Sequence, residues 1–357
     1  MSERVVLVTG ANGHLARLLV RRYLDAGATV VATARGEAVE AVARGLGVPT
    51  LAADLDHDDP FAAVDDGWRR RITTVVHAAA VTRFNVDRHV ARRVNVDGTG
   101  KALELARACP ALESFGHVST VYATGLRAGP ILEQPYDDAP GFANAYEESK
   151  WAAEALVVAA DDVPWRVLRV ATVVADDATG TVTRYNAVHE TLKLWFYGLL
   201  SLVPGRGDTP LYLVTGRFVA DAVARLTDPA VEGGVYHVAH DRSESLTLDR
   251  FLDVAAAEFA SVEEFARKRI LRPLLADEQS FELLVDGVTP FAGGLVTSAL
   301  GNVMPFARQL YVDKQVDNAR LRAALGDRYE APDPAALVAA TCARLAATRW
   351  GRRLVDA

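Results

Sequence analysis

Residues 5–16 read Val-Val-Leu-Val-Thr-Gly-Ala-Asn-Gly-His-Leu-Ala, and this stretch decides the fold. An unbroken apolar run such as 5–8 is typical of a parallel strand that is buried on both faces. The run passes into a turn with Gly10 and Gly13, and residues 15–26 then have the pattern of a helix. A strand, a glycine turn and a helix in this order predict a site for the pyrophosphate of a dinucleotide at the helix N-terminus.

The rest of the N-terminal half repeats the alternation of strands and helices. Repeated strand–helix units with short turns predict an α/β fold of the Rossmann type, built on a doubly wound parallel sheet. The further strands are expected over 29–34, 48–52, 73–80, 114–119 and 165–174, and the longer helices over 93–108 and 146–160.

The alternation becomes irregular after about residue 175. We expect residues 1–175 to form the nucleotide-binding Rossmann domain, with 208–240 rejoining it through a strand at 235–239. The remaining segments, 176–207 and 241–357, are expected to form a smaller, mostly helical C-terminal lobe that binds the substrate.

Composition narrows the classes of function. The chain has 357 residues, half of them hydrophobic, and a net charge of −7, which argues against a disordered chain and against a nucleic-acid partner. Its two cysteines lack metal-ligand spacing, so no metal site is expected. The N-terminus has no signal-peptide pattern, and the most apolar stretch, 192–203, is too short to span a membrane. These features predict a cytoplasmic protein; they do not decide whether it forms a homodimer.

The end of the second strand bears on the choice of cofactor. NAD-binding proteins of this fold commonly carry a carboxylate there for the ribose, but this chain has Ala34 followed by Arg35. A guanidinium can bind a 2′-phosphate through two hydrogen bonds, which favours NADP(H); Arg35 as a solvated loop residue is the alternative. The expected cofactor contacts are Gly10, Asn12, Gly13, His14, Leu15, Arg35, Asp54, Leu55, Ala78, Ala79, Ala80 and Lys150.

Three residues suggest acid–base chemistry at the carboxyl edge of the sheet. Tyr146 and Lys150 stand four residues apart on one helix face, and Thr120 follows the strand that precedes them. A nearby ammonium is expected to lower the pKa of the tyrosine phenol, which is about 10 in free tyrosine. The trio predicts a carbonyl oxygen held by Thr120 and protonated by Tyr146. The structural alternatives are that Tyr146 is a half-buried ring, Lys150 a solvated helix residue and Thr120 a cap at the end of a strand.

These motifs resemble the extended short-chain dehydrogenase/reductase superfamily over about residues 4–240. The resemblance rests on the glycine turn with Ala16, on 95–99 (Asn-Val-Asp-Gly-Thr), on 118–120 (Val-Ser-Thr) and on Tyr146-x-x-x-Lys150. Residues 77–84 and 144–150 resemble the branch of thioester reductases and fatty-acyl-CoA reductases, which includes mupirocin-pathway-type reductases. The resemblance implies catalytic roles for Thr120, Tyr146 and Lys150, with Asn95 organising a proton-relay water.

The function expected from these features is NADPH-dependent reduction of an acyl thioester, ketone or aldehyde in secondary or lipid metabolism. A nucleotide-sugar epimerase or dehydratase of the same fold is an alternative, although a dehydratase of this type has Asp-Glu after the catalytic Thr, where this chain has Val121-Tyr122. A non-catalytic NADP-sensing protein is another, although such proteins typically lose the Tyr/Lys pair.

Large apolar residues in the C-terminal half suggest a pocket for an apolar or carrier-bound acyl substrate. We expect two segments to close over the nicotinamide end of the cofactor, because a bare sugar would call for more polar side chains. They comprise Trp195, Phe196, Tyr197, Leu199 and Leu200 in the first and Phe291, Leu295, Val296, Leu300, Val303, Met304 and Phe306 in the second. Packing within the core of the lobe, or in a dimer surface, is the alternative.

Overall fold

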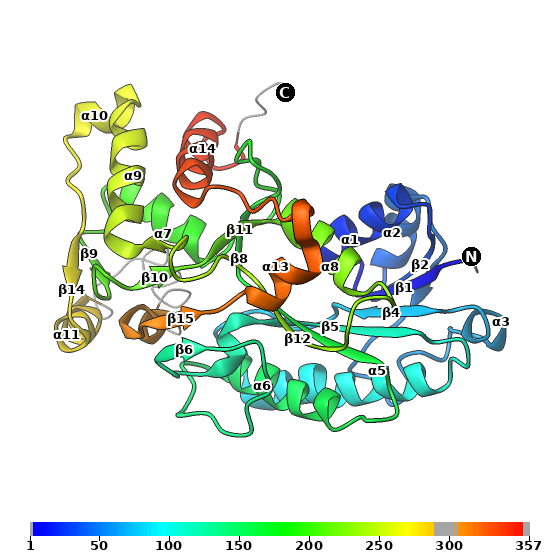
Figure 1. Cartoon of the computed structure of the whole chain (residues 1–357). Coiled ribbons are helices and arrows are strands. Elements are labelled where there is room, and N and C mark those ends of the chain that lie inside the picture. Colours follow the sequence, from blue (N-terminus) through cyan, green and yellow to red (C-terminus); the bar gives the residue numbers. More distant parts are fainter. Residues whose placement is uncertain (1–2, 289–303, 305, 353–357) are drawn as a thin grey trace.

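A central parallel sheet organises the computed structural model, which describes residues 3–288, 304 and 306–352 (Figure 1). Seven strands lie in the order β12–β7–β5–β4–β1–β2–β3. The order reverses between β1 and β4, and ligands bind outside the carboxyl ends of the strands at such a point. The strands are β1 (Val5–Thr9), β2 (Thr29–Ala34), β3 (Thr50–Ala52), β4 (Thr74–His77), β5 (Ser114–Thr120), β7 (Trp165–Val170) and β12 (Gly234–Val238).

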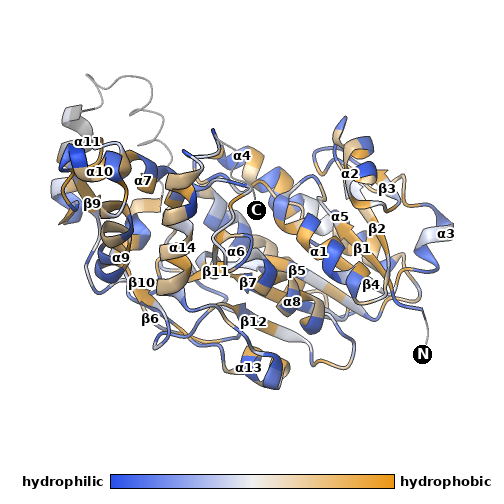
Figure 2. Cartoon of the chain, turned by 90° about the horizontal axis from the view of Figure 1, so that it is seen from above, coloured by the Kyte–Doolittle hydropathy of each residue, from blue (hydrophilic) through white to orange (hydrophobic). Residues whose placement is uncertain are grey.

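Helices cover both faces of the sheet, which explains the unbroken apolar runs. Alternate residues of a strand face opposite sides, so Val6 and Val8 pack in one core cluster and Val5 and Leu7 in another. The first cluster contains residues of α1 (His14–Asp25) and α8 (Gly216–Leu226), and the second contains residues of α5 (Gly98–Arg107) and α6 (Ala145–Val158). In Figure 2 the strands β1, β2 and β4 are largely hydrophobic, whereas the surface of α1 is partly hydrophilic.

Shorter elements connect and extend these layers. A π-helical segment, η1 (Arg92–Asp97), joins α4 to α5, and such a distortion is frequent at functional sites. The others are α2 (Ala38–Leu46), α3 (Asp66–Arg69), α4 (Arg88–Ala91), the 3-10 segments η2 (Val121–Thr124), η3 (Arg308–Tyr311) and η4 (Gly326–Arg328), and α13 (Ala319–Leu325).

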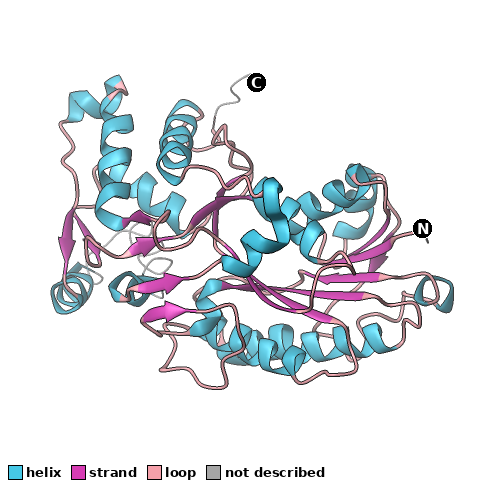
Figure 3. Cartoon of the chain, in the orientation of Figure 1, coloured by secondary structure: helices cyan, strands magenta, loops and turns pink. Residues whose placement is uncertain are grey.

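The C-terminal lobe is mostly helical but also contains short strand pairs (Figure 3). Its helices are α7 (Ala187–Phe196), α9 (Leu248–Ala260), α10 (Glu263–Lys268), α11 (Glu278–Val288) and α14 (Pro334–Ala347). The pairs are β8 (Thr172–Ala175) with β11 (Leu213–Thr215), β9 (Leu202–Pro204) with β14 (Leu274–Ala276), β10 (Pro210–Leu211) with β13 (Leu246–Thr247), and β15 (Lys314–Val316) with β6 (Gly129–Ile131).

The predicted fold class is confirmed, with differences at particular elements. The strand expected over 165–174 breaks at Ala171, whose N–H donates to the carbonyl of Val238 (3.1 Å) before β8 leaves the sheet to pair with β11. In the lobe, α7 ends at Phe196, because Gly198 adopts φ +76° and the chain then continues into β9.

Part of the C-terminal segment, α13, packs on the central sheet and not in the lobe. α13 packs against α8 and β12, so the sheet is covered there by residues from 319–325. β12 itself pairs in parallel with β7 at the edge of the sheet. Among the described residues, no helix is both long and apolar enough to cross a membrane.

Candidate active site

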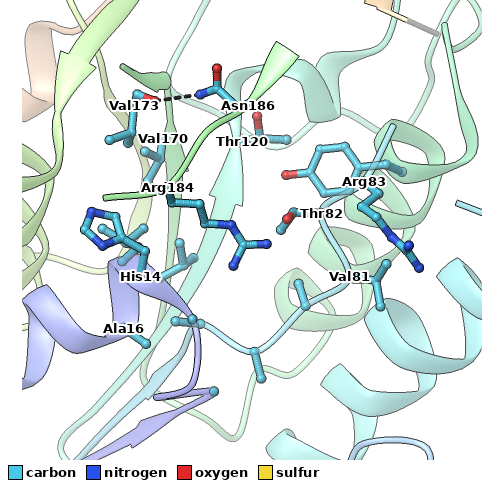
Figure 4. Close-up of a pocket in the computed structure, with 18 of the residues that line it drawn as sticks. His14, Ala16, Val81, Thr82, Arg83, Thr120, Val170, Val173, Arg184 and Asn186 are labelled. Atoms are coloured by element: carbon cyan, nitrogen blue, oxygen red, sulfur yellow. Dashed lines mark hydrogen bonds between the residues drawn. The ribbon is translucent and has the colours of Figure 1, made fainter. Parts of the chain in front are cut away.

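A cavity of about 990 Å³ lies at the carboxyl edge of the sheet, above the point where the strand order reverses. This volume is at the upper end of the range for small-molecule and cofactor sites. Figure 4 shows the cavity between the glycine turn, the ends of the strands and the loop before α7. The sequence-predicted residues that line it are Gly10, Asn12, Gly13, His14, Leu15, Arg35, Asp54, Leu55, Ala78, Ala79, Ala80, Thr120, Tyr146 and Lys150.

The glycine turn is shaped for a close approach of backbone to ligand. Gly10 has φ +75°, and a Cβ there would lie 2.7 Å from the Cα of Ala79. A Cβ on Gly13 would lie 3.1 Å from the carbonyl oxygen of Gly10. The hydroxyl of Thr9 holds the opposite side of the turn by accepting from the N–H groups of Ala78 and Ala79, both at 3.1 Å. This arrangement, with the N-terminus of α1 behind it, fits a pyrophosphate.

His14 makes contacts that the sequence did not predict. Its Nε2 lies 2.8 Å from Asp176 Oδ1, and its Nδ1 lies 2.8 Å from the hydroxyl of Thr183. Burial acts to raise the pKa of Asp176, but the contact with His14 and the hydrogen bonds from Thr183 together outweigh it and hold the pKa below its ordinary value. His14 therefore ties the loop before α7 to the glycine turn, which leaves its ring nitrogens engaged with protein groups.

The same loop brings an unpredicted cation to the cavity. Arg184 points its guanidinium into the open space between the glycine turn and Thr82 (Figure 4). Arg35 lines the other end of the cavity, next to the fully buried Ala34. Within the described residues neither guanidinium has an acidic partner, so both are available to an anionic ligand.

Thr120 and Tyr146 meet at the end of β5. Thr120 is the last residue of this strand, and its hydroxyl forms a hydrogen bond with the phenol of Tyr146, which is only 9% exposed. Burial raises the pKa of Tyr146 above its ordinary value, and the hydrogen bond with Thr120 only partly opposes this. The expected net lowering of the pKa of Tyr146 is therefore contradicted, because burial holds this pKa above its ordinary value.

Lys150 lies one helical turn beyond Tyr146 and is 3% exposed. Its ammonium donates to the carbonyl of Val118 (2.8 Å) and lies 3.1 Å from Nε2 of His117. Burial lowers the pKa of Lys150 to about 8, while the carboxylate of Glu154 acts in the opposite direction. The ammonium is thus held at the floor of the cavity by contacts with β5.

Asn95 does not line the cavity. Its side chain accepts from the N–H of Val81 (2.8 Å) and donates to the carbonyl of Val81 (3.0 Å) and to the hydroxyl of Ser149 (2.9 Å). These bonds connect η1 with the loop after β4 and with α6. The amide therefore positions these elements, and its expected role in organising a relay water stays a prediction.

The apolar wall of the cavity comes from an unexpected part of the chain. Trp195 is 1% exposed, packs edge-to-face against Phe259 (5.5 Å) and belongs to the core of the lobe, so the apolar end of α7 does not supply the cavity wall. The first turn of α7 does line the cavity, through Ala187 and Glu190. Phe84 instead packs against Tyr146 (5.8 Å) and stacks on Phe306 (5.1 Å). The cavity-lining apolar residues that pack in one cluster with Tyr146 are Val81, Phe84 and Val90, and Tyr122 lines the cavity beside them.

The second predicted apolar segment is only partly described. Residues 291–303 lie outside the described residues. Met304 packs in a small cluster with Phe281, and Phe306 is also in edge-to-face contact with Tyr122 (5.1 Å). Of this segment, Phe306 is therefore the described residue that reaches the wall beside Tyr146.

The amino-acid sequence is similar to one protein family and to two larger proteins. The family described as male sterility protein matches residues 64–223. The alcohol-forming fatty acyl-CoA reductase of Simmondsia chinensis is 29% identical over 170 aligned positions, covering 38% of this chain and 34% of that protein. The isonitrile lipopeptide synthase of Mycobacterium tuberculosis is 27% identical over 311 aligned positions, covering 70% of this chain and 12% of that protein. The chain thus spans 34% and 12% of the length of these two relatives.

Solved structures at low sequence identity share the fold. The terminal R domain of the myxalamid PKS-NRPS pathway has a TM-score of 0.80 at 21% identity, covering 98% of this chain and 92% of that one. A thiolation-reductase di-domain from an archaeal non-ribosomal peptide synthetase has a TM-score of 0.73 at 15% identity, covering 99% and 77%.

The parallel sheet and its glycine turn are shared with these solved structures. The chain is similar in sequence to a fatty acyl-CoA reductase and in fold to the terminal reductase domains. The resemblance predicted from the motifs is confirmed.

Proposed function

We propose that the protein is an NADPH-dependent reductase of acyl thioesters. One observation carries the proposal: Thr120, Tyr146 and Lys150 line the same cavity as the glycine turn and Arg35. A proton donor, a buried cation and a dinucleotide cradle in one space are what carbonyl reduction by hydride transfer needs. The similarity to a fatty acyl-CoA reductase and to terminal reductase domains supports a thioester as the carbonyl compound.

The roles of the side chains follow from their chemistry. A bound nicotinamide would supply hydride to the carbonyl carbon. Thr120 donates a hydrogen bond to the carbonyl oxygen and holds it beside the phenol of Tyr146. Tyr146, kept protonated by burial, gives its proton to that oxygen, and the ammonium of Lys150 stabilises the phenolate that remains. With a thioester the product is a thiohemiacetal, whose collapse releases an aldehyde and a thiol.

The experiment that tests the proposal measures NADPH oxidation at a fixed NADPH concentration. Long-chain acyl-CoA thioesters are expected to be reduced to aldehydes, detected with a carbonyl-trapping reagent. A nucleotide sugar such as UDP-glucose serves as the comparison, because an epimerase would interconvert sugars with no net cofactor oxidation. Turnover of the nucleotide sugar without thioester reduction would replace the proposal with that alternative.

The apolar wall beside Tyr146 leads to a prediction on chain length. Burying one methylene contributes about 0.8 kcal/mol, so kcat/KM should rise roughly fourfold per added methylene until the wall is covered. Val90 is half-buried on α4 and lines the cavity, so Val90→Trp should end this rise at a shorter chain. Trp195→Phe is the control, because Trp195 packs in the core of the lobe and its loss should leave the chain-length profile unchanged. A flat profile in the wild type would contradict the apolar site.

Arg35 leads to a prediction on cofactor choice. Arg35→Ala is expected to weaken NADPH binding by about 1.5 kcal/mol, or roughly tenfold, since a charge-assisted hydrogen bond to the 2′-phosphate is lost. NADH lacks that phosphate, so its Kd should stay the same. Both dissociation constants can be measured by fluorescence titration without substrate. Equal affinity of the wild type for the two nucleotides would show that Arg35 is a solvated loop residue.

A further inference from the structure

A buried histidine lies directly beneath Lys150. His117, on β5, has no exposed surface, and its Nε2 is 3.1 Å from the ammonium of Lys150. His117 does not line the cavity, so it cannot touch a bound substrate or cofactor. Its contact with the active site runs through Lys150.

The contact fixes the protonation state of the imidazole. An ammonium carries only donors, so Nε2 of His117 must accept, and the ring is neutral with its proton on Nδ1. Burial, together with the charge of Lys150 and the neighbouring His77, holds the pKa of His117 well below its ordinary value. Nδ1 of His117 has no hydrogen-bond partner among the described residues, so the ring's defined polar contact is the one with Lys150.

His77, on the neighbouring strand β4, provides a natural comparison. Its ring stacks on that of His117 with centroids 5.7 Å apart, and it is 1% exposed. The hydroxyl of Thr9 already accepts from two backbone N–H groups, so its proton goes to Nδ1 of His77, 3.0 Å away. His77 therefore shares the burial and neutrality of His117 but makes its hydrogen bond away from Lys150.

We propose that His117 is a positioning residue for Lys150: its neutral imidazole accepts from the ammonium and, with the carbonyl of Val118, fixes two of the three N–H donors. The third donor is then left for the cavity, where Tyr146 lies. The role of Lys150 beside Tyr146 in catalysis rests on the proposed reductase function. The hydrogen bond between Lys150 and His117 does not depend on that function. Neither the motif at 118–120 nor the Tyr146/Lys150 spacing assigns this role.

The charged surroundings of Lys150 determine the expected pH effect. The titratable groups that face it are His117 on β5, His77 on β4, Tyr146 and Glu154 on α6, and Tyr122 on η2 beyond Tyr146; Arg169 on β7 is paired with Glu154 (2.7 Å). An acceptor for the ammonium favours the charged form, so its removal lowers the pKa of Lys150 from about 8. Activity that needs the ammonium would then be lost at a lower pH.

The test compares three variants of the full-length protein. His117→Asn removes the acceptor at the Nε2 position, His117→Gln restores an oxygen there, and His77→Asn keeps the acceptor for Thr9 as the matched control. Lysine side chains labelled with ¹³C at Cε report the titration in the free protein, and Lys150→Met assigns the signal among the five lysines. The expected result is a fall of about one pKa unit in His117→Asn, a tenfold change in the protonation equilibrium. His117→Gln and His77→Asn should stay close to the wild type.

Activity supplies the second readout. The high-pH limb of kcat should move down by the same amount in His117→Asn and stay in place in the other two variants. An unchanged Lys150 titration in His117→Asn, or an equal shift in His77→Asn, would overturn the proposal. If His117→Asn does not fold, ¹⁵N spectra of the wild-type imidazoles decide, since a proton on Nε2 of His117 contradicts the proposal. If the protein reduces no thioester, the Lys150 titrations still test the role of His117. The reductase proposal and the His117 proposal can therefore be contradicted independently.

Discussion

Tyr146→Phe is expected to lower kcat by about 10²–10⁴-fold, the usual contribution of a positioned general acid, while the Kd for NADPH stays close to that of the wild type. The phenol meets Thr120 at the end of β5, and burial keeps it protonated, so its removal takes away the proton that the carbonyl oxygen needs. Single-turnover rates with NADPH and an acyl-CoA substrate measure the loss, and fluorescence titration measures the cofactor affinity.

A second buried tyrosine separates this effect from a general loss of stability. Tyr23 on α1 is also fully buried, and its hydroxyl forms a hydrogen bond with that of Thr227, the C-cap of α8. Tyr23→Phe removes a buried hydroxyl of the same kind away from the cavity. It should therefore lower the midpoint of thermal unfolding while kcat stays close to that of the wild type. Full activity in Tyr146→Phe would refute the assignment of the proton donor.

The sheet could be predicted from the sequence because its signal is local. Each parallel strand is buried on both faces, so runs such as 5–8 are apolar throughout, and the turns and helices follow at short spacing. The small strands of the lobe could not be predicted in the same way. Residues 314–316 pair with 129–131, and 274–276 pair with 202–204, and three-residue strands joined over such separations leave no periodic pattern.

The shared location of Thr120, Tyr146 and Lys150 could be predicted for the same reason, whereas their surroundings could not. Tyr146 and Lys150 share a helix face by spacing alone, and Thr120 ends a strand that leads to the same edge. The loop that carries Arg184 has no regular pattern, and the contacts of His14 with Asp176 and Thr183 in the structure show where it lies. An apolar helix such as the one with Trp195 can face a cavity or a core, and composition does not distinguish the two.

Gly10→Ala is expected to destabilise the protein by about 2–5 kcal/mol, because left-handed strain of about 1–2 kcal/mol adds to an overpacking cost of about 1–3 kcal/mol. A methyl group on Gly10 would lie 2.7 Å from the Cα and 2.9 Å from the Cβ of Ala79. The turn and residues 78–80 must separate to admit it, and both line the cavity proposed for the cofactor. NADPH binding should therefore weaken by roughly 100-fold, the equivalent of about 2.7 kcal/mol of lost binding free energy.

Gly27→Ala is the matched control for this prediction. Gly27 has φ +78°, nearly the same as the +75° of Gly10, but a Cβ there would meet nothing within 4 Å. The two variants therefore share the conformational strain, and only Gly10→Ala adds the collision with Ala79. Thermal unfolding should show a loss of about 1–2 kcal/mol for Gly27→Ala with an unchanged Kd for NADPH. Equal Kd values in the two variants would mean that the close approach of the glycine turn to the loop after β4 does not shape the cofactor site.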